Sequence, residues 1–513
     1  MKKKILSLIL ACGLVISMTA CGAPAGNTAA PEAPAAESAE APASEEAGNP
    51  DEWPSVVMEV ISFTDEQAQE ATVENALNDY LVSINAGVKA DLLPLAFGDR
   101  GTQITLLLSE PDALDLFCWR FYSTVDGLVK NDQVISLDQY KDQYPELWEL
   151  YPESVYDTCT INGHLYSLPG ADSFGNFNCY VMRKDVAEDI GVMDKVNTKI
   201  TMDELNEMLL KAKEVHPEYC YQTTTDFVSL MGIDNLGNPD AIGVLLNRGV
   251  DQTEIVNYYE TDEFREYCEL CRFWWDNGLI VDDPLTTDKG GIMGDGISAG
   301  GFVDGYSLDY IYSLMAAQLP MEVVLFQMND YVGTNSCVYN GWNISSNCTH
   351  PDAAMKLLSI LATDATAANI VSMGVEGVTY VLDEKGCAWY PEGLDANTVG
   401  WNCNAPWWYP NECLTHPFET EMETYFTDME ACWFDEDSKF SSAMGFVFDN
   451  TEVYDEMTAC SAVIGEYRDA LWYGQVDIDT TLPKFIDELK AAGIDKVIAA
   501  ENEQFQAFLA AKQ

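Results

Sequence analysis

Val56-Val57-Met58-Glu59-Val60-Ile61-Ser62-Phe63 is rich in β-branched and apolar residues, and this composition predicts a β-strand. Behind it, Val73, Leu77 and Leu81 recur at helical spacing, and Val88 to Leu95 returns to the pattern of a strand. This alternation of strand and helix predicts an α/β fold, in which a parallel-rich sheet is flanked by helices.

Three segments that combine polar and aromatic side chains follow predicted strands. Ligands of open α/β sheets bind beyond the carboxyl ends of the strands, so the position of these segments makes them candidates for a binding site. They are Thr64-Asp65, Trp119 to Tyr122, and Asp172 to Asn176. Within them we expect ligand contacts from Thr64, Asp65, Trp119, Arg120, Tyr122, Phe174 and Asn176.

A fourth segment, Trp401 to Pro410, holds four large aromatics, two asparagines and two prolines. The prolines exclude a helix or a central strand. Trp and Tyr offer flat apolar faces with a polar edge, which suits a sugar ring that is apolar on its faces and hydroxylated around its rim. We therefore expect sugar contacts from Trp401, Asn402, Trp407 and Trp408. The alternative is a loop whose aromatic side chains cap the core.

Asp304 and Tyr306 follow a glycine-rich loop between Asp288 and Gly301 that leads into a predicted strand. We expect both to contact the ligand. Asp304, Asp65 and Arg120 are the expected polar partners, because carboxylates and guanidinium groups can bind two adjacent hydroxyls. Surface solvation or an ion pair is the alternative role for each of them.

Two local motifs predict structure more than function. Thr201 and Glu204 form a capping box ahead of a helix expected over 202–215. Cys268 and Cys271 form a C-x-x-C on one face of another expected helix, where buried thiols are favoured over a redox pair.

The first twenty residues are typical of a secretory signal peptide, with Lys2, Lys3 and Lys4 before an apolar run. Small residues precede Cys21 as in a bacterial lipobox, so we expect signal cleavage after residue 20 and acylation of Cys21. Cleavage near Ala23 with release of the protein is the alternative. Residues 21–53 are expected to form a disordered tether rich in Ala, Pro and Glu, because this segment lacks the apolar residues needed for a core.

The composition limits the kind of partner. The chain has 84 Asp and Glu against 26 Lys and Arg, a formal charge of −58, and such an acidic protein repels nucleic acid. No nucleic-acid partner is therefore expected. The four histidines stand far apart and no second C-x-x-C accompanies the first, so no metal centre or other cofactor is predicted.

Several segments resemble the extracellular solute-binding proteins of carbohydrate ABC importers, family 1 type, in the branch of lipid-anchored binders. The C-terminal region carries the most specific agreement, and weaker agreement occurs at Asn162 to Pro169, Asn347 to Pro351 and Gly374 to Tyr380. The agreeing C-terminal segments are Gly445-Phe446-Val447-Phe448-Asp449, Gly474-Gln475-Val476-Asp477 and Leu489 to Val497. One departure is Ser109 to Asp115, where the family often shows a Gly-Glu pair and Tyr-Asp.

The resemblance implies a two-lobed periplasmic-binding-protein-like fold of type II, with a ligand cleft at the hinge. We expect one lobe to comprise residues 54–170 and 336–442, and the other 171–335 and 443–513. The implied function is capture of a sugar, expected to be an oligosaccharide, and its delivery to the transmembrane permease subunits of an ABC importer. The protein is expected to be a monomer, anchored through acylated Cys21 to the outer face of the cell membrane, and no enzyme.

Two other functions remain open from the residues alone. A secreted glycoside hydrolase would use a pair of carboxylates, such as Asp304 with Asp309 or Glu419 with Glu421, although nothing singles out one pair. A structural or adhesive wall lipoprotein would be expected to show repeats, and none is visible. A structural calcium ion on the loop Asp234 to Asn238 is a further possibility, but the loop lacks the closing Glu of an EF-hand.

Overall fold

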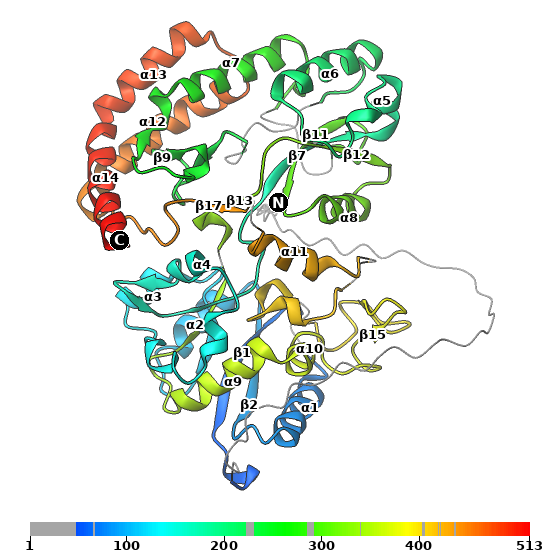
Figure 1. The fold of residues 1–513 in the computed structure, drawn as a ribbon, viewed down its shortest axis with the longest axis vertical. Helices are drawn as coiled ribbons and strands as arrows, with labels where there is room; N and C mark the ends of the chain where they lie inside the picture. The colour runs from blue at the N-terminus through cyan, green and yellow to red at the C-terminus, as the bar shows by residue number, and fades with distance from the viewer. Residues whose placement is uncertain are drawn as a thin grey trace, which may run out of the picture.

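The structure is a computed structural model of the 513-residue chain. It describes residues 48–64, 67–221, 230–284, 292–338, 340–402, 406–418, 420, 422–435 and 438–512. The elements gather into two lobes, one above the other, with α11 (Tyr425–Trp433) and the short strands β13 (Val332–Gly333) and β17 (Lys439–Phe440) between them (Figure 1).

The lower lobe is built on a five-stranded sheet in the order β2-β1-β3-β14-β6. The run that predicted a strand forms β1, which pairs in parallel with β2 over its whole length and with β3 at Met58 and Leu116. The strands are β1 (Ser55–Ser62), β2 (Lys89–Ala96), β3 (Leu116–Cys118), β6 (Leu168–Pro169) and β14 (Gly341–Ile344). Strand β14 runs antiparallel to both β3 and β6, because the chain re-enters this sheet from the upper lobe.

Helices cover the lower sheet because their apolar positions fall on one face. Val73, Leu77 and Leu81 of α1 are fully buried, as their spacing predicted. Pro351 begins α9 without losing a helical hydrogen bond, and Asp364 caps the next helix through its side chain. The helices of this lobe are α1 (Glu70–Ser83), α2 (Arg100–Leu107), α3 (Val125–Lys130), α4 (Glu153–Asp157), α9 (Pro351–Thr363) and α10 (Ala365–Met373).

The upper lobe contains a three-stranded sheet in the order β11-β7-β12. Strand β7 is antiparallel to both neighbours, so this sheet is antiparallel. It differs in this from the parallel-rich sheet that the N-terminal sequence predicts. The predicted capping box is confirmed, since the Thr201 and Glu204 side chains each accept a hydrogen bond from the other residue's backbone N–H. The elements are β7 (Phe177–Arg183), β11 (Gly300–Gly305), β12 (Val323–Gln327), α5 (Lys184–Asp189), α6 (Met202–Val215) and α8 (Leu308–Gln318).

A helical layer completes the upper lobe and contains the C-terminal residues (Figure 1). Gly493, with φ +102°, separates its last two helices, and only glycine adopts that conformation without strain. Cys268 and Cys271 are buried here among helices, as predicted, and all twelve cysteines in the described ranges are free thiols. The helices of this layer are α7 (Asp262–Asp276), α12 (Tyr454–Trp472), α13 (Ile478–Ala492) and α14 (Ile494–Ala511), and the strands beside them are β8 (Ile233–Asp234), β9 (Gly243–Leu246) and β10 (Val256–Asn257).

Three chain segments cross between the lobes and contact one another. Asn176 of the first forms an antiparallel bridge with Val332 of the second, and β13 in the second pairs in parallel with β17 in the third. Arg248 is buried beside them and donates to the carbonyl oxygens of Asn176 at 2.9 Å and of Val332 at 3.1 Å. The crossing is therefore held by backbone pairing and by one guanidinium group.

Two searches of the described ranges complete the fold. No single helix there is long and apolar enough to cross a membrane, whereas α9 and α10 pass that test only as a pair, bent by 94°. The same ranges contain no group of three or more His, Cys, Asp or Glu side chains placed to hold a metal ion.

Candidate functional site

Four aromatic rings form a closed ring of contacts where the parallel strands of the lower lobe end. Phe63 follows β1, Phe97 follows β2, Phe121 follows β3, and Trp407 lies in the short helix η8 (Pro406–Trp408). We call these four side chains the aromatic platform. Successive ring centroids are 5.8 Å (Phe63 to Phe97), 5.6 Å (Phe97 to Phe121), 5.9 Å (Phe121 to Trp407) and 6.3 Å (Trp407 to Phe63) apart.

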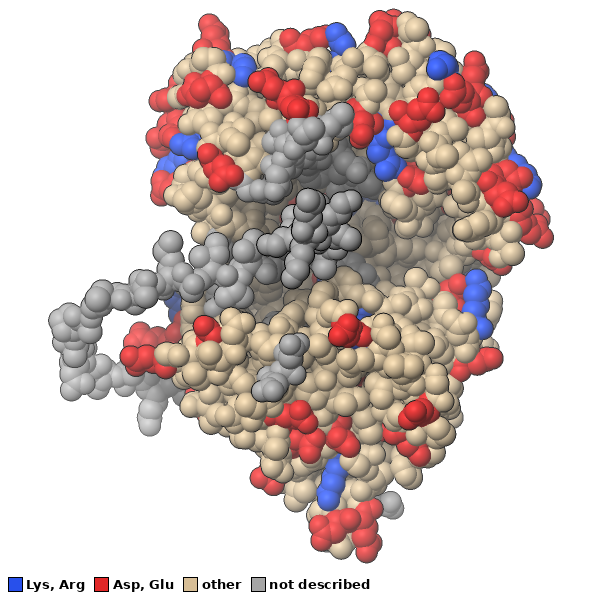
Figure 2. Space-filling view, turned by 180° about the vertical axis from the view of Figure 1, so that it is seen from behind, with Lys and Arg blue, Asp and Glu red and all other residues tan. Residues whose placement is uncertain are grey.

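The platform is exposed, which is unusual for large aromatic side chains. The exposed fractions of Phe63, Phe97 and Phe121 are 44%, 41% and 64%, and Trp407 is half-buried. Strands β1 and β2 rise toward the upper lobe, so their carboxyl ends face the space between the lobes (Figure 1). The molecule is hollowed between its lobes, and acidic side chains are spread over both (Figure 2). An apolar surface at this position can bind a flat apolar group of a ligand.

Arg120 supports the platform from beside it. Its guanidinium carbon lies 4.4 Å from the centre of the Trp407 ring and 5.1 Å from that of Phe121. The same group donates to the Trp407 carbonyl oxygen at 2.9 Å and contacts the Asp172 carboxylate at 3.4 Å. Stacking and hydrogen bonding together fix Trp407, and the carboxylate balances the charge of Arg120.

Two buried acids lie behind Arg120. The first is Asp172, its ion-pair partner, and the second is Glu412 in the short helix η9 (Glu412–Leu414). Burial raises the pKa of Glu412 well above its usual value, the charge of Asp172 raises it further, and Arg120 opposes the shift. Burial and the neighbouring Asp172 thus favour the protonated form of Glu412, whereas Arg120 favours its charged form.

The upper lobe contributes a polar group near the crossing. The Asp304 carboxylate accepts a hydrogen bond from the Asn176 amide at 3.1 Å, and the Asn176 side-chain oxygen accepts one from Arg248 at 2.6 Å. Asp304 as a residue is exposed, yet protein atoms crowd its carboxylate, and this desolvation raises its pKa against the opposing influence of Asn176 and Arg248. Asn176 and Asp304, both expected at the site, thus lie together.

Several residues expected at the site belong to the core instead. Trp401 and Trp408 are each 2% exposed, and their indole rings pack inside the lower lobe. Trp408 packs against Trp342 at 4.5 Å, whereas the Trp401 indole N–H donates to the Val371 carbonyl oxygen at 3.1 Å. Of the three tryptophans proposed to stack on a sugar, only Trp407 presents its ring at the surface. The burial of Trp401 and Trp408 matches the alternative given for this segment, a loop whose aromatic side chains cap the core.

Phe174 and Tyr306, also expected to contact a ligand, are buried. Phe174 lies 4.9 Å from the ring of Trp433, and the Tyr306 hydroxyl donates to the Tyr425 carbonyl oxygen at 3.0 Å. Both contacts are made to α11, and Tyr306 thereby joins the upper lobe to that helix.

The remaining expected residues lie close to the platform without forming it. Thr64 follows Phe63 directly, and the buried Asn402 accepts a hydrogen bond from the Phe63 backbone N–H at 3.2 Å. Trp119 packs with both clusters of the lower core, and Tyr122 hydrogen-bonds Gln133 at 3.1 Å. Asp65, Cys21, Glu419 and Glu421 lie outside the described residues.

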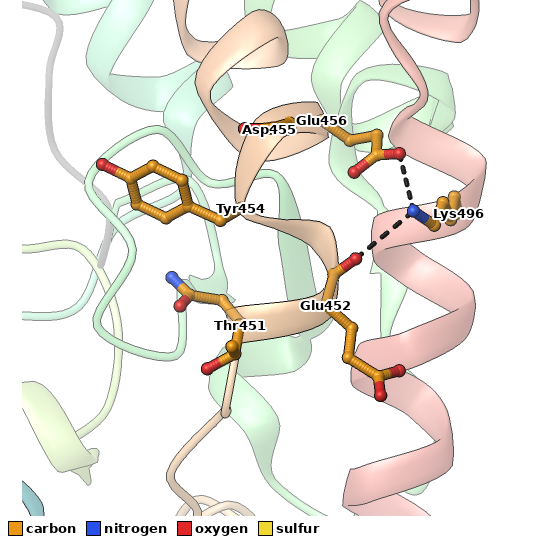
Figure 3. Close-up of a pocket in the computed structure, with 7 residues that line it drawn as sticks. Thr451, Glu452, Tyr454, Asp455, Glu456 and Lys496 are labelled. Carbon is orange, nitrogen blue, oxygen red and sulfur yellow. Dashed lines mark hydrogen bonds and ion pairs between the residues drawn. The ribbon is translucent and has the colours of Figure 1, made fainter.

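A second hollow lies at the start of α12 in the upper lobe (Figure 3). Lys496 there bonds the Glu456 carboxylate at 2.6 Å and the Glu452 carbonyl oxygen at 3.3 Å, while Tyr454 points away from Lys496. The lysine is already paired and no group of aromatic faces lines the hollow, so the aromatic platform is the better candidate for binding a solute.

Comparison with known proteins identifies the architecture. A family model described as a domain of unknown function, DUF3502, matches residues 442–510. A Streptococcus pneumoniae protein named carbohydrate ABC transporter substrate-binding protein is 23% identical over 457 residues, covering 84% of this chain and 87% of the relative. The crystal structure of the N-glycan transport solute-binding protein NgtS from the same species overlaps with a TM-score of 0.72, at 20% identity over 90% of this chain and all of NgtS. The chain has the fold of an extracellular solute-binding protein.

Structures of NgtS with bound sugar and of another solute-binding protein give lower TM-scores. NgtS in complex with Man1GlcNAc and with Man5GlcNAc gives TM-scores of 0.61 and 0.58, over 89% and 90% of this chain and 100% and 99% of NgtS. An HMO-binding, ABC-transporter-associated solute-binding protein from Bifidobacterium longum infantis gives 0.57, at 14% identity, over 90% of this chain and all of that protein. These likenesses confirm the two-lobed type II fold.

Sequence reasoning missed three of the four platform residues. Phe63 belongs to the run predicted as a strand, Phe121 lies in the candidate segment Trp119 to Tyr122 but is not among the expected contacts, and Phe97 lies in none of the candidate segments. These three residues share a feature that the sequence shows: each is a phenylalanine within three residues of the end of a parallel strand of the same sheet. A search for aromatics at equivalent strand ends would have found all three.

Proposed function

We propose that this protein captures a carbohydrate, an oligosaccharide, outside the cell and delivers it to the permease subunits of an ABC importer. The observation that carries the proposal is the exposed aromatic platform at the carboxyl ends of β1, β2 and β3. The names of the Streptococcus pneumoniae relatives, a carbohydrate substrate-binding protein and an N-glycan transport protein, support the same function.

The chemistry of the platform suits a sugar. The faces of a pyranose ring carry C–H groups that pack on aromatic rings, whereas its rim carries hydroxyls that need hydrogen-bonding partners. The four contacting rings present several apolar faces and edges, and we propose that they contact more than one unit of an oligosaccharide. Thr64 beside the platform and Asp304 with Asn176 in the upper lobe are the proposed polar partners.

Closure of the two lobes around the sugar is part of the proposal. We assign residues 54–170 and 336–442 to one lobe, and residues 171–335 and 443–513 to the other. This partition is supported by the crossing segments, which pair with one another at Asn176, Val332 and β17. The lower TM-scores against the sugar complexes of NgtS, at almost unchanged coverage, fit a fold whose lobes change their relative orientation.

Attachment to the membrane is proposed to occur through Cys21, after removal of residues 1–20 and with residues 21–53 as tether. A monomer then presents its cleft on the outer face of the membrane. The measurement is the distribution of the Cys21→Ala protein, which should leave the membrane fraction or keep its leader. Full membrane retention of a processed Cys21→Ala protein would refute the acylated anchor.

We also propose that the protein binds without catalysing a reaction. Asp304, a candidate for a glycosidase pair, is hydrogen-bonded to Asn176 and lies next to the crossing. Prolonged incubation with bound oligosaccharide should release no reducing ends. Steady release that is lost in Asp304→Asn would favour the glycosidase instead.

The direct test is calorimetry with a panel of neutral oligosaccharides that includes Man5GlcNAc, on wild type, Trp407→Ala and Trp389→Ala. Loss of a stacking indole should weaken binding by about thirtyfold or more, whereas Trp389 lies in the hairpin of β15 (Val381–Leu382) and β16 (Ala388–Trp389) and serves as the control. Equal affinity of Trp407→Ala and wild type for every sugar that binds would exclude the platform as the site.

A further inference from the structure

A buried ion pair lies beneath the strand ends that carry the aromatic platform. Glu59, in the middle of β1, is fully buried, and Arg100, the first residue of α2, is 2% exposed. Their contact is bidentate, with Nη2 2.5 Å from Oε1 and Nε 3.0 Å from Oε2. Glu59 is the one charged residue of β1.

The other hydrogen bonds of this pair converge on one short piece of backbone. The Cys118 N–H donates to Glu59 Oε1 at 2.6 Å, and Arg100 Nη2 donates to the Cys118 carbonyl oxygen. Arg100 Nη1 donates to the carbonyl oxygen of Arg120 at 2.6 Å. The pair therefore holds the chain on both sides of Trp119, directly before Phe121.

Stability alone does not account for this arrangement. Burying two charges has a large desolvation cost, and replacing a buried ion pair by apolar residues of similar size is often neutral or stabilising. The cost is visible at Glu59, because burial raises its pKa and Arg100 opposes the rise. What the ion pair supplies that apolar side chains cannot is a fixed direction for the peptide groups that it binds.

The direction of these peptide groups matters at Phe121, the residue after Arg120. Phe121 has φ +56°, a left-handed conformation that a bulky side chain rarely adopts. In this conformation its ring contacts Phe97 and Trp407 and remains exposed. A segment free to relax would leave this strained conformation and open the platform.

We propose that Glu59 and Arg100 are positioning residues for the solute site, which hold the end of β3 so that Phe121 completes the aromatic platform. The role of the platform in sugar binding rests on the proposed function. The rigidity of residues 118–122 can be measured without any sugar.

The test is Arg100→Lys in the full-length protein, followed by amide hydrogen exchange and by calorimetry with Man5GlcNAc. Lysine keeps a positive charge beside Glu59, but its single ammonium group cannot reproduce the guanidinium fork. Exchange at Cys118 and Tyr122 should become at least tenfold faster, and affinity for Man5GlcNAc should fall at least tenfold. The matched control is Arg468→Lys, because Arg468 pairs with Asp240 in the upper lobe and should leave both measurements unchanged.

A folded Arg100→Lys protein with wild-type exchange at residues 118–122 would overturn the proposal. If that variant does not fold, the Glu59→Met, Arg100→Met double variant replaces both charges by apolar groups and should fold with fast exchange at the same amides. Failure of both variants to fold would assign the pair to the fold alone and overturn the proposal. If wild type binds no oligosaccharide, the proposed function fails, and the exchange result still decides whether the pair positions this segment.

Discussion

Phe121 offers a test in which stability and binding respond differently to the same substitution. Its left-handed φ of +56° costs about 1 kcal/mol for a residue with a Cβ, and glycine removes this cost. With 64% of Phe121 exposed, only about a third of its surface contributes to folding. A fully enclosed Phe buries about 200 Å², so this share is about 70 Å², or about 2 kcal/mol at about 25 cal/mol per Å².

These magnitudes predict an unusual order of stability. Phe121→Ala loses the contacts and keeps the strain, so its free energy of unfolding should fall by about 2 kcal/mol. Phe121→Gly loses the same contacts but relieves the strain, and it should be the more stable of the two variants by about 1 kcal/mol, the reverse of the usual preference for alanine.

Binding should not follow this order. Both variants lack the ring, so both should lose about 2 kcal/mol of sugar binding, or about thirtyfold in affinity. Urea denaturation and calorimetry on the two variants measure the two effects separately. If Phe121→Ala is the more stable variant, the strain argument is refuted, and if either variant binds as wild type does, Phe121 does not belong to the site.

Three further predictions concern the core, the crossing and pH. Trp401→Ala should lower the free energy of unfolding by about 3 to 5 kcal/mol. At a temperature where the variant is folded, its sugar affinity should equal that of wild type. Weakened sugar binding by the folded variant would place Trp401 in the site. Arg248→Met should cost about 3 kcal/mol, because it leaves the backbone oxygens of two crossing segments without their donor. Arg183→Met removes a pair with Asp185 and a stack on Tyr219, and should change stability by about 1 kcal/mol or less. Equal melting temperatures for both variants would contradict this. Burial raises the pKa of Glu501 to about 7, so the folded protein retains a proton that the unfolded chain releases above its usual pKa of 4.5, and the free energy of unfolding falls as pH rises from about 4.5 to about 7. Glu501→Gln should remove this pH-dependent loss of stability, which is worth about 3 kcal/mol at pH 8 and nothing at pH 4. The control is Glu503→Gln, an exposed position on the same helix, which should leave the pH profile unchanged. Parallel pH profiles for wild type and Glu501→Gln would refute the raised pKa of Glu501.

The local elements were predictable because their causes are local. The composition of residues 55–62 is sufficient for a strand, and the spacing of Val73, Leu77 and Leu81 is sufficient for the buried face of α1. The Thr201 and Glu204 side chains cap a helix through contacts three residues apart. Such features require no knowledge of the rest of the chain.

The binding surface was harder to predict because distant residues decide which aromatics are buried. Trp401, Trp407 and Trp408 share one segment and the same residue type, yet only Trp407 reaches the surface. The Trp408 ring is covered by Trp342, 66 residues earlier, whose indole N–H donates to the Trp408 carbonyl oxygen. Such a partner is set by tertiary packing and leaves no trace within the ten-residue segment.

The placement of β14 in the lower sheet has a consequence for how the protein acquires its structure. Strands β3 and β6 lie on either side of β14, which pairs Trp342 with Cys118, more than two hundred positions earlier in the chain. A chain that emerges N-terminus first must keep the facing edges of β3 and β6 unpaired until the whole upper-sheet region has followed. Neither lobe can be finished while the chain is still emerging, because each waits for residues beyond the other. Slow folding, transiently exposed strand edges and dependence on holdase chaperones are the expected results of this order of assembly.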